Sequence, residues 1–301
     1  MIFKCVCVCA LILIMILLIV YVKQKETNSK YYNRFVNEIE STMMIRDLSN
    51  IIKYPIYYIN LEKAVNRRIY MENQFKKYNI KTYTRINGIN GTDKDSYKLN
   101  TNYSEFLHSP NILHYHQIGC ILSHFLAIKA FYDSNQPIGI IFEDDVNLSP
   151  LGHLNNNFTL DCLINAAPLD WEIISLQTSS CNDFNNLDIF LYKRTDELEH
   201  CWSAAGYLIT RNGAKKIIDQ VILNNEFTIN HISSGFPRYP VTDEYIYALV
   251  NTYYVGPSII YPYEFNVDDV FRTNDTLVYK YIHNGYPNYT GDIQIIDNPF
   301  N

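Results

Sequence analysis

Three acidic residues follow one another directly after a short apolar segment. The segment at 138–142 leads into Glu143, Asp144 and Asp145. Like charges this close raise one another's pKa and repel each other, and a bound divalent cation removes that conflict. Carboxylate oxygens suit Mg²⁺ or Mn²⁺, which also bridge to phosphates. The residues alone therefore allow two interpretations, a metal site for a phosphate-bearing ligand or a solvated acidic turn.

Other polar side chains have types that suit such a site. Arg67 and Arg68 come shortly after the first β-prone segment of the globular region, and a guanidinium can donate two hydrogen bonds to a phosphate. They are equally compatible with exposed charges on the first turns of a helix. Ser123 and His124 lie within an apolar helical pattern, where a histidine can also be a buried structural residue. No segment resembles a nucleophile elbow, which argues against a hydrolase triad.

Alternating strand and helix patterns are expected to position these residues. Short β-prone or apolar runs predict strands at 55–61, 81–86, 138–142, 171–176 and 203–210. Helical patterns occur at 66–78, 117–132, 214–223 and 243–250, with a turn at Asn212 and Gly213 before the third. This alternation predicts an α/β fold with a mostly parallel sheet, in which ligands bind at the carboxyl ends of the strands.

The N-terminus predicts a membrane anchor. No charged residue occurs at 5–22, and at about 1.5 Å per residue this apolar run is about 27 Å long, enough for the hydrocarbon core of a bilayer. A cleaved signal peptide is the alternative, but its apolar region would be shorter and 21–24 makes a poor cleavage site. We therefore expect an anchor at 1–22 and a polar stem at 23–53.

The side of the membrane is left open by the residues. Lys23, Lys25 and Lys30 follow the apolar run and favour a cytosolic C-terminal domain. Several Asn-x-Ser/Thr sequons would place that domain in a lumen, but only if they are glycosylated. The two tendencies oppose each other, and neither decides the orientation.

Composition and cysteine spacing exclude some classes of protein. The chain has 301 residues, is 48% hydrophobic and 19% charged, and is therefore globular rather than disordered. A net charge of −6 argues against a nucleic-acid partner. Cys120, Cys162, Cys181 and Cys201 show no C-x-x-C spacing, which argues against a structural zinc site. Free buried thiols and a Cys181–Cys201 disulfide both remain possible.

The chain resembles glycosyltransferase family 25, the group that contains lipopolysaccharide-biosynthesis and collagen galactosyltransferases. The resemblance covers roughly residues 54–250 and rests on five stretches that occur in the family's order. These are YINL at 58–61 with Arg67, Arg68 and Met71 after it, RINGING at 85–91, GCILSH at 119–124, IIFEDDV at 140–146, and AGYLIT at 205–210 with Gly213 and Ala214. Each stretch alone is weak, but five in order are specific.

The resemblance implies a GT-A fold, in which a metal ion holds the diphosphate of a nucleotide-sugar donor. By that resemblance Asp145 is the direct ligand of Mn²⁺ or Mg²⁺, Asp144 is a shared or supporting ligand, and Glu143 contacts the nucleotide side of the donor. His283 is a further candidate for the metal shell. Such a metal would screen the charge that develops on the departing diphosphate.

The same resemblance gives roles to the remaining candidates. Arg67 and Arg68 would bind the donor, and Ser123 and His124 would lie on the substrate side. The family is described as inverting, which requires a general base near the acceptor hydroxyl. Asp243 is the expected base, and its alternative is an acidic residue that stabilises a helix N-terminus.

These inferences predict a membrane-anchored enzyme. We expect a GT-A-like domain at 54–265 and a C-terminal extension at 266–301, with the lumenal side slightly favoured by the resemblance. The expected reaction moves a hexose, galactose or glucose, from a UDP-sugar to a glycan or protein hydroxyl. The alternative is a non-catalytic, membrane-anchored family member that binds glycans or partners. The three adjacent carboxylates argue against it, because a binding module has no need to retain them.

Overall fold

A computed structural model of the chain describes residues 46–103, 112–178, 188–195, 203–230, 241–263 and 288–296. The chain divides into two compact units, 1–46 and 47–301, and the helices and strands assigned within the described residues all belong to the second. The expected anchor at 1–22 and most of the expected stem lie outside the described residues. Within the described ranges, no helix combines the length and apolar character needed to cross a membrane. The anchor stays a prediction.

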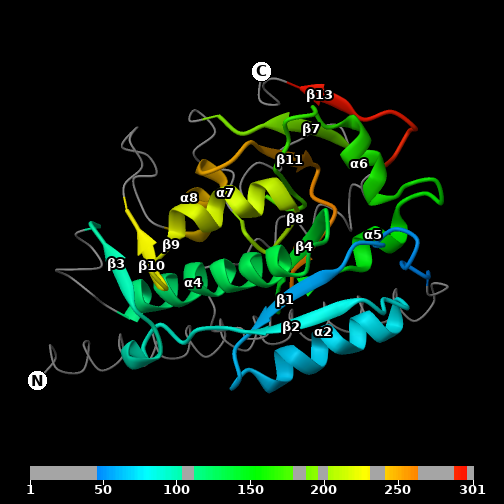
Figure 1. Cartoon of the computed structure of the whole chain (residues 1–301). Coiled ribbons are helices and arrows are strands. Elements are labelled where there is room, and N and C mark those ends of the chain that lie inside the picture. Colours follow the sequence, from blue (N-terminus) through cyan, green and yellow to red (C-terminus); the bar gives the residue numbers. More distant parts are fainter. Residues whose placement is uncertain are drawn as a thin grey trace, which may run out of the picture. The chain divides into compact units, whose positions relative to one another are not determined.

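One large mixed sheet forms the centre of the unit (Figure 1). Its eight strands follow the order β2-β1-β4-β8-β6-β11-β7-β13. Their bounds are β1 Ile56–Asn60, β2 Tyr83–Asn87, β4 Ile138–Glu143, β6 Ile173–Ser175, β7 Phe190–Lys193, β8 Gly206–Thr210, β11 Thr252–Gly256 and β13 Gln294–Ile296.

The direction of the strands differs in part from the expected mostly parallel sheet. β1 is parallel to β2 and β4, and β6 is parallel to β11. However, β8 is antiparallel to both β4 and β6, and β7 is antiparallel to β11. An apolar run shows that a segment is a buried strand but carries no signal for its direction. The fold is therefore mixed α/β, with β8 reversed at the middle of the sheet.

Shorter strands form two additional ladders. β10 pairs in parallel with β3 and antiparallel with β9, and β12 pairs antiparallel with β5. The second ladder brings the chain after residue 260 beside the residues that follow the acidic cluster. The bounds are β3 Leu99–Thr101, β5 Val146–Asn147, β9 Ile222–Leu223, β10 Glu226–Ile229 and β12 Tyr261–Pro262, with one 3₁₀ turn at Lys94–Ser96.

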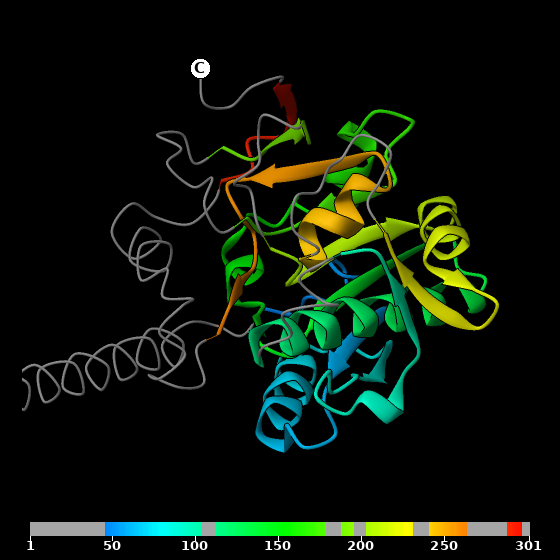
Figure 2. The same cartoon turned by 90° about the vertical axis from the view of Figure 1, so that its left-hand side faces the viewer.

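Helices cover both faces of the large sheet (Figure 2). Successive strand residues point to opposite faces, so in β4 Ile140 and Phe142 belong to one apolar core and Ile141 to the other. The first core includes residues of α2, α5 and α6, and the second includes residues of α4, α7 and α8. The helices are α2 Val65–Lys77, α4 Ile112–Asp133, α5 Ser149–His153, α6 Leu160–Ala166, α7 Arg211–Val221 and α8 Thr242–Ala248.

The folded unit is longer at both ends than the expected domain at 54–265. Leu48, Ile51 and Ile52 are buried in the first core, although they belong to the segment expected as stem. Strand β13 lies in the expected C-terminal extension, yet it pairs in parallel with β7 of the large sheet. Both segments are part of the folded unit. Each has only a few apolar residues, so the sequence did not predict that they would pack with the domain.

Helix α7 begins at Arg211 rather than after the turn expected at Asn212 and Gly213. The side chain of Thr210 accepts a hydrogen bond from the backbone N–H of Gly213 at 3.0 Å, which caps the helix. A threonine N-cap is a strong start signal, and here it overrides the Asn-Gly turn signal. Gly213 is required for another reason, because an added Cβ would lie 2.9 Å from Cβ of Glu172.

The loop after β2 packs directly on α4 and fixes the position of that helix. A Cβ added to Gly91 would lie 1.7 Å from the carbonyl oxygen of Tyr115, so the loop backbone and the helix backbone are in close contact. The hydroxyl of Ser123 accepts a hydrogen bond from Ile89 N at 2.8 Å and donates one to Gly119 O at 2.5 Å. Two of the five family-like stretches, at 85–91 and 119–124, therefore meet in space.

Candidate active site

The acidic cluster Glu143, Asp144 and Asp145 lies at the carboxyl ends of β1 and β4. In the parallel pair of these strands Ile59 is opposite Glu143. The next residue of β1, Asn60, therefore lies beside Asp144, and its side-chain amide donates to Oδ2 of Asp144 at 2.6 Å. The cluster therefore lies at the edge of the sheet where ligands bind in parallel α/β sheets.

Arg67 of α2 forms ion pairs with two members of the cluster. Its Nη1 lies 3.0 Å from Oδ1 of Asp144 and 3.2 Å from Oδ2 of Asp145. The two aspartates are only 8% and 5% exposed. Burial raises the pKa of Asp144 despite the hydrogen bond from Asn60 and the charge of Arg67. Burial opposes the charge of Arg67, but the attraction of Asp145 and Asp144 outweighs it and raises the pKa of Arg67.

The donor set of the cluster fits a hard divalent cation. Glu143, Asp144 and Asp145 supply carboxylate oxygens, and the side-chain amide of Asn60 donates a hydrogen bond to Asp144. The negative charge of three adjacent carboxylates exceeds the single positive charge that Arg67 brings to the cluster. Oxygen donors with excess negative charge match the ligands that Mg²⁺ and Mn²⁺ take in proteins. The residues present therefore fit the metal that the resemblance implies.

Arg68 turns away from this cluster. Successive residues of an α-helix point about 100° apart, and Nη1 of Arg68 lies 3.6 Å from Oε1 of Glu62. Arg85 of β2 is closer to the site, because its Nε donates to Oδ1 of Asn60 at 3.0 Å. Asn60 and Arg85 were not among the predicted site residues. A polar residue ending a buried strand was a signal for Asn60, and Arg85 opens the family-like stretch at 85–91, although no role was predicted for it.

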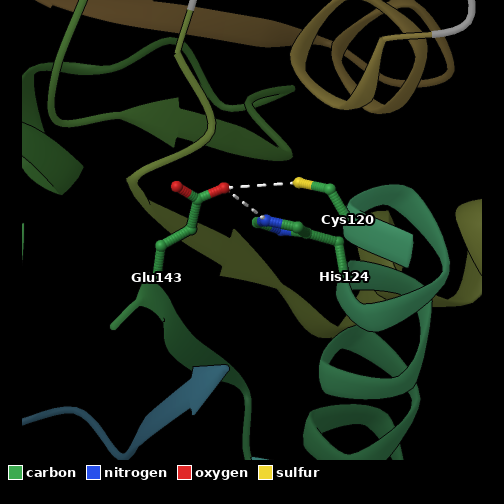
Figure 3. Close-up of side chains that lie close together, drawn as sticks. All are labelled: Cys120, His124 and Glu143. Carbon is green, nitrogen blue, oxygen red and sulfur yellow. Dashed lines mark hydrogen bonds and ion pairs between the residues drawn. The ribbon is translucent and has the colours of Figure 1, made fainter. Parts of the chain in front are cut away.

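Glu143 also belongs to a second group of side chains (Figure 3). Cys120 and His124 project from α4 toward its carboxylate. His124 Nε2 lies 3.3 Å from Oε1 of Glu143, and Cys120 Sγ lies 3.5 Å from the same oxygen. The other ring nitrogen of His124, Nδ1, is 3.0 Å from the hydroxyl of Tyr207 on β8. Burial and then the charge of Glu143 raise the pKa of Tyr207 well above its usual value.

The first turn of α8 reaches the same group. The hydroxyl of Thr242 donates to Sγ of Cys120 at 3.1 Å. Asp243 is the next residue, and its Oδ1 accepts from the N–H of Glu244 at 3.0 Å. Val241 is the N-cap residue of α8, and Thr242 is the first residue of the helix. The structure therefore brings the predicted base to the neighbourhood of Glu143 through the contact of Thr242 with Cys120.

Ser123 and His124 have different surroundings, although they are neighbours and were expected together on the substrate side. Ser123 is 2% exposed, and both of its hydroxyl hydrogen bonds go to backbone groups of the loop and of α4. This arrangement gives Ser123 a positioning role. His124 instead faces Glu143. His283, Cys181 and Cys201 lie outside the described residues.

Two tyrosines lie beside the acidic cluster and were not identified from the sequence. The backbone N–H of Tyr263 donates to the carbonyl of Asp145 at 2.5 Å. Its ring stacks on Tyr70 of α2, with ring centroids 4.5 Å apart. Tyr263 directly follows β12. The pair provides an aromatic surface next to the carboxylates.

Comparison with known proteins gives a consistent result. The model of a family described as "Glycosyltransferase family 25 (LPS biosynthesis protein)" matches residues 53–231. The chain is 21% identical over 277 residues to a "Glycosyltransferase 25 family member" of Anopheles gambiae, covering 85% of this chain and 46% of that protein. It is 23% identical over 266 residues to a protein of the same name from Aedes aegypti, covering 81% and 42%.

The residues matched by the family model include only some of the candidate site residues. The chain spans about half the length of the curated relatives that it matches. The family match at 53–231 includes Arg67, the helix that carries Cys120 and His124, and the acidic cluster. It ends before α8, the helix that carries Asp243.

Proposed function

The chain belongs to glycosyltransferase family 25, as the resemblance predicted, and from this we propose that it transfers a hexose from a UDP-sugar to a hydroxyl of a glycan or protein. We further propose a GT-A type of domain, inversion at the anomeric carbon, and galactose or glucose as the hexose. The observation that supports this function best is the cluster Glu143, Asp144 and Asp145 at the carboxyl ends of β1 and β4, held by Asn60 and Arg67.

In this proposal each residue of the cluster has a distinct task. Asp145 is the direct ligand of Mn²⁺ or Mg²⁺. Asp144 supports it, because both of its oxygens already accept hydrogen bonds, one from Asn60 and one from Arg67. When bound, the metal supplies positive charge that offsets the negative charge on the departing UDP. Glu143 contacts the nucleotide side of the donor.

Arg67 has a double task. In the structure its guanidinium holds Asp144 and Asp145 in place, and its side chain is 33% exposed. It is therefore buried enough to fix the two carboxylates and open enough to donate to a phosphate oxygen of the donor. Arg68 pairs with Glu62, and we give it no direct contact with the donor. The stacked rings of Tyr70 and Tyr263 offer a surface for the uracil base.

The proposed function is tested by donor hydrolysis in the absence of an acceptor. The full chain is incubated with UDP-galactose or UDP-glucose in Mn²⁺ or in EDTA, and released UDP is measured. We expect release with one of these donors in Mn²⁺ and none in EDTA. Should neither UDP-sugar be hydrolysed, and calorimetry show no Mn²⁺-dependent binding of UDP, the chain would instead be a non-catalytic member that binds glycans or partners.

Asp243 is the proposed general base, which removes the proton of the acceptor hydroxyl. We expect Asp243→Asn to lower turnover with an acceptor by about 100-fold, because general bases contribute at least this factor. Binding of UDP should stay within a few-fold of the wild type, because the acidic cluster is unchanged. The measurement is steady-state transfer together with calorimetry of UDP binding.

Glu244→Gln is the matched control for Asp243→Asn. Both acidic residues lie in the first turn of α8, so both substitutions remove one charge from the same helix N-terminus. We expect Glu244→Gln to keep most of the turnover. Equal losses in the two variants would show that Asp243 acts on the helix dipole and would remove its role as the base.

We also propose a single-pass membrane protein anchored by 1–22, with the catalytic domain on the lumenal side. The uncharged run at 5–22 supports the anchor, and the lumenal side rests on the family resemblance. Protease protection of the full chain in sealed membrane vesicles would distinguish the two sides. A lumenal domain is protected, whereas a cytosolic one is degraded.

A further inference from the structure

Cys120, His124 and Glu143 place three different metal-binding groups together at the edge of the active site (Figure 3). One candidate ligand atom of each residue lies within 4.8 Å of those of the other two. We propose that these three residues form a Zn²⁺ site, separate from the Mn²⁺ or Mg²⁺ ligand Asp145. This site goes beyond the proposed transferase function. It shares Glu143 with the proposed donor site, but it is tested by metal binding alone, so its failure is distinguishable from failure of the transferase proposal.

Two of the three distances between the ligand atoms match tetrahedral zinc. With usual zinc bond lengths, a tetrahedral site has about 3.3 Å between a nitrogen and an oxygen ligand and about 3.5 Å between a sulfur and an oxygen ligand. In this structure Nε2 of His124 is 3.3 Å and Sγ of Cys120 is 3.5 Å from Oε1 of Glu143. Both pairs that include Glu143 therefore have the spacing of ligands around one ion, and the candidate ligand atoms of Cys120 and His124 lie within 4.8 Å of each other.

Neighbouring groups hold the ligands in the orientation that zinc requires. Nδ1 of His124 is 3.0 Å from the hydroxyl of Tyr207, which can accept a hydrogen bond from Nδ1–H and leave the lone pair of Nε2 for the metal. The hydroxyl of Thr242 donates to Sγ of Cys120 at 3.1 Å, which stabilises a thiolate. Support of each ligand by an outer hydrogen bond is the usual arrangement in zinc sites.

The chemistry of the ligands selects the metal. A thiolate and an imidazole suit Zn²⁺, whereas Mg²⁺ takes oxygen ligands. Asp144 and Asp145 therefore offer a site to the harder ion, and the group of Cys120, His124 and Glu143 offers one to zinc. Three protein ligands also match zinc sites that keep a fourth position for water or another small ligand.

The lack of C-x-x-C spacing between the cysteines argues against a structural zinc site. The present site needs one cysteine only. Cys120 and His124 are four residues apart on α4 and therefore share one face of the helix, and Glu143 comes from the end of β4. The i, i+4 spacing was visible in the sequence, but the third ligand became apparent only from the packing of α4 against the sheet.

Metal binding by the full, metal-free chain tests this proposal. We expect one Zn²⁺ to bind per chain through this site, and Co²⁺ in its place to give the absorption of a thiolate-to-cobalt charge transfer. Cys120→Ser should remove that absorption and weaken Zn²⁺ binding at least about 10-fold, since even the loss of an outer partner costs this much. Cys162→Ser is the control, because Cys162 lies on α6 away from the site, and it should behave as the wild type.

Labelling of the wild-type chain gives a second test that requires no substitution. Zn²⁺ should slow alkylation of Cys120 by iodoacetamide, located by mass spectrometry, and leave Cys162 unaffected, while Mg²⁺ protects neither. Both thiols are partly exposed, so each can serve as the reference for the other. Equal alkylation of Cys120 with and without Zn²⁺, or unchanged Zn²⁺ affinity in Cys120→Ser, would overturn the proposal. Both tests measure binding alone, so they stand whether or not UDP release is observed.

Discussion

Asp145→Asn is expected to lower Mn²⁺-dependent release of UDP by about 1,000-fold. This is the upper end of the loss seen when one group that stabilises the charge of a transition state is removed. Asparagine has nearly the same size as aspartate, so the substitution removes a negative charge without opening a cavity. An amide oxygen is a weaker ligand for a divalent cation than a carboxylate. The measurement is UDP release at saturating donor over a series of Mn²⁺ concentrations.

The structure indicates that this substitution leaves the surrounding residues in place. Arg67 keeps its ion pair with Asp144 at 3.0 Å, and Asn60 keeps its hydrogen bond to the other oxygen of Asp144. The backbone carbonyl of residue 145 still accepts from the N–H of Tyr263. A loss of activity in a variant that melts like the wild type would therefore report on the metal and not on the fold.

Calorimetry distinguishes a loss of metal-dependent UDP binding from a loss of the chemical step alone. We expect Asp145→Asn to weaken Mn²⁺-dependent binding of UDP as well as its release. The control is Asp133→Asn, which removes an exposed carboxylate paired with Lys129 at the far end of α4 and should keep wild-type activity. Normal UDP binding and release in Asp145→Asn would contradict its assignment as metal ligand and would move that role to Glu143 or Asp144.

Much of the architecture could be predicted from local sequence patterns. The expected strand at 138–142 and helix at 117–132 correspond to β4 and α4, because an uninterrupted apolar run and a 3.6-residue repeat are local signals. The position of the acidic cluster followed directly, since Glu143 ends the strand. Family membership could also be predicted, because five short stretches kept their order along the chain.

The contacts within the site could not be predicted from the sequence, because they join segments that are far apart along the chain. Arg67 and Asp144 are 77 positions apart, and Thr242 and Cys120 are 122 positions apart. No periodic pattern in one segment reports such a contact. The same holds for the reversal of β8, which depends on how the chain returns to the sheet. Ser123 is an example. Its place beside His124 in the sequence suggested that the two residues share a role, but its hydroxyl forms hydrogen bonds with backbone groups instead.

Gly91→Ala is expected to destabilise the fold by about 3 kcal/mol, at the upper end for overpacking a well-filled interior. The added Cβ would lie 1.7 Å from the carbonyl oxygen of Tyr115 and 2.8 Å from the backbone N of Gly119. Both atoms belong to the backbone of α4 and cannot be moved by rotating a side chain. Either the loop at 88–91 or the helix must shift.

Gly152→Ala is the matched control, since the same methyl group meets no atom within 4 Å at that position. Gly152 lies in helix α5, where alanine is favoured over glycine by up to about 1 kcal/mol. Urea unfolding followed by circular dichroism measures both variants, and a lower midpoint with an unchanged slope reports a loss of stability. Equal midpoints for Gly91→Ala and the wild type would show that the loop and α4 are not in close contact.

The consequence of Gly91→Ala extends to the active site because α4 carries both Cys120 and His124. If the helix moves to accept the methyl group, the hydrogen bond from Ile89 N to Ser123 breaks and His124 shifts relative to Glu143. At temperatures where Gly91→Ala remains folded, we therefore expect it to lose Zn²⁺ affinity, whereas Gly152→Ala keeps it. Loss of stability with full Zn²⁺ affinity would mean that the loop moves and α4 stays in place.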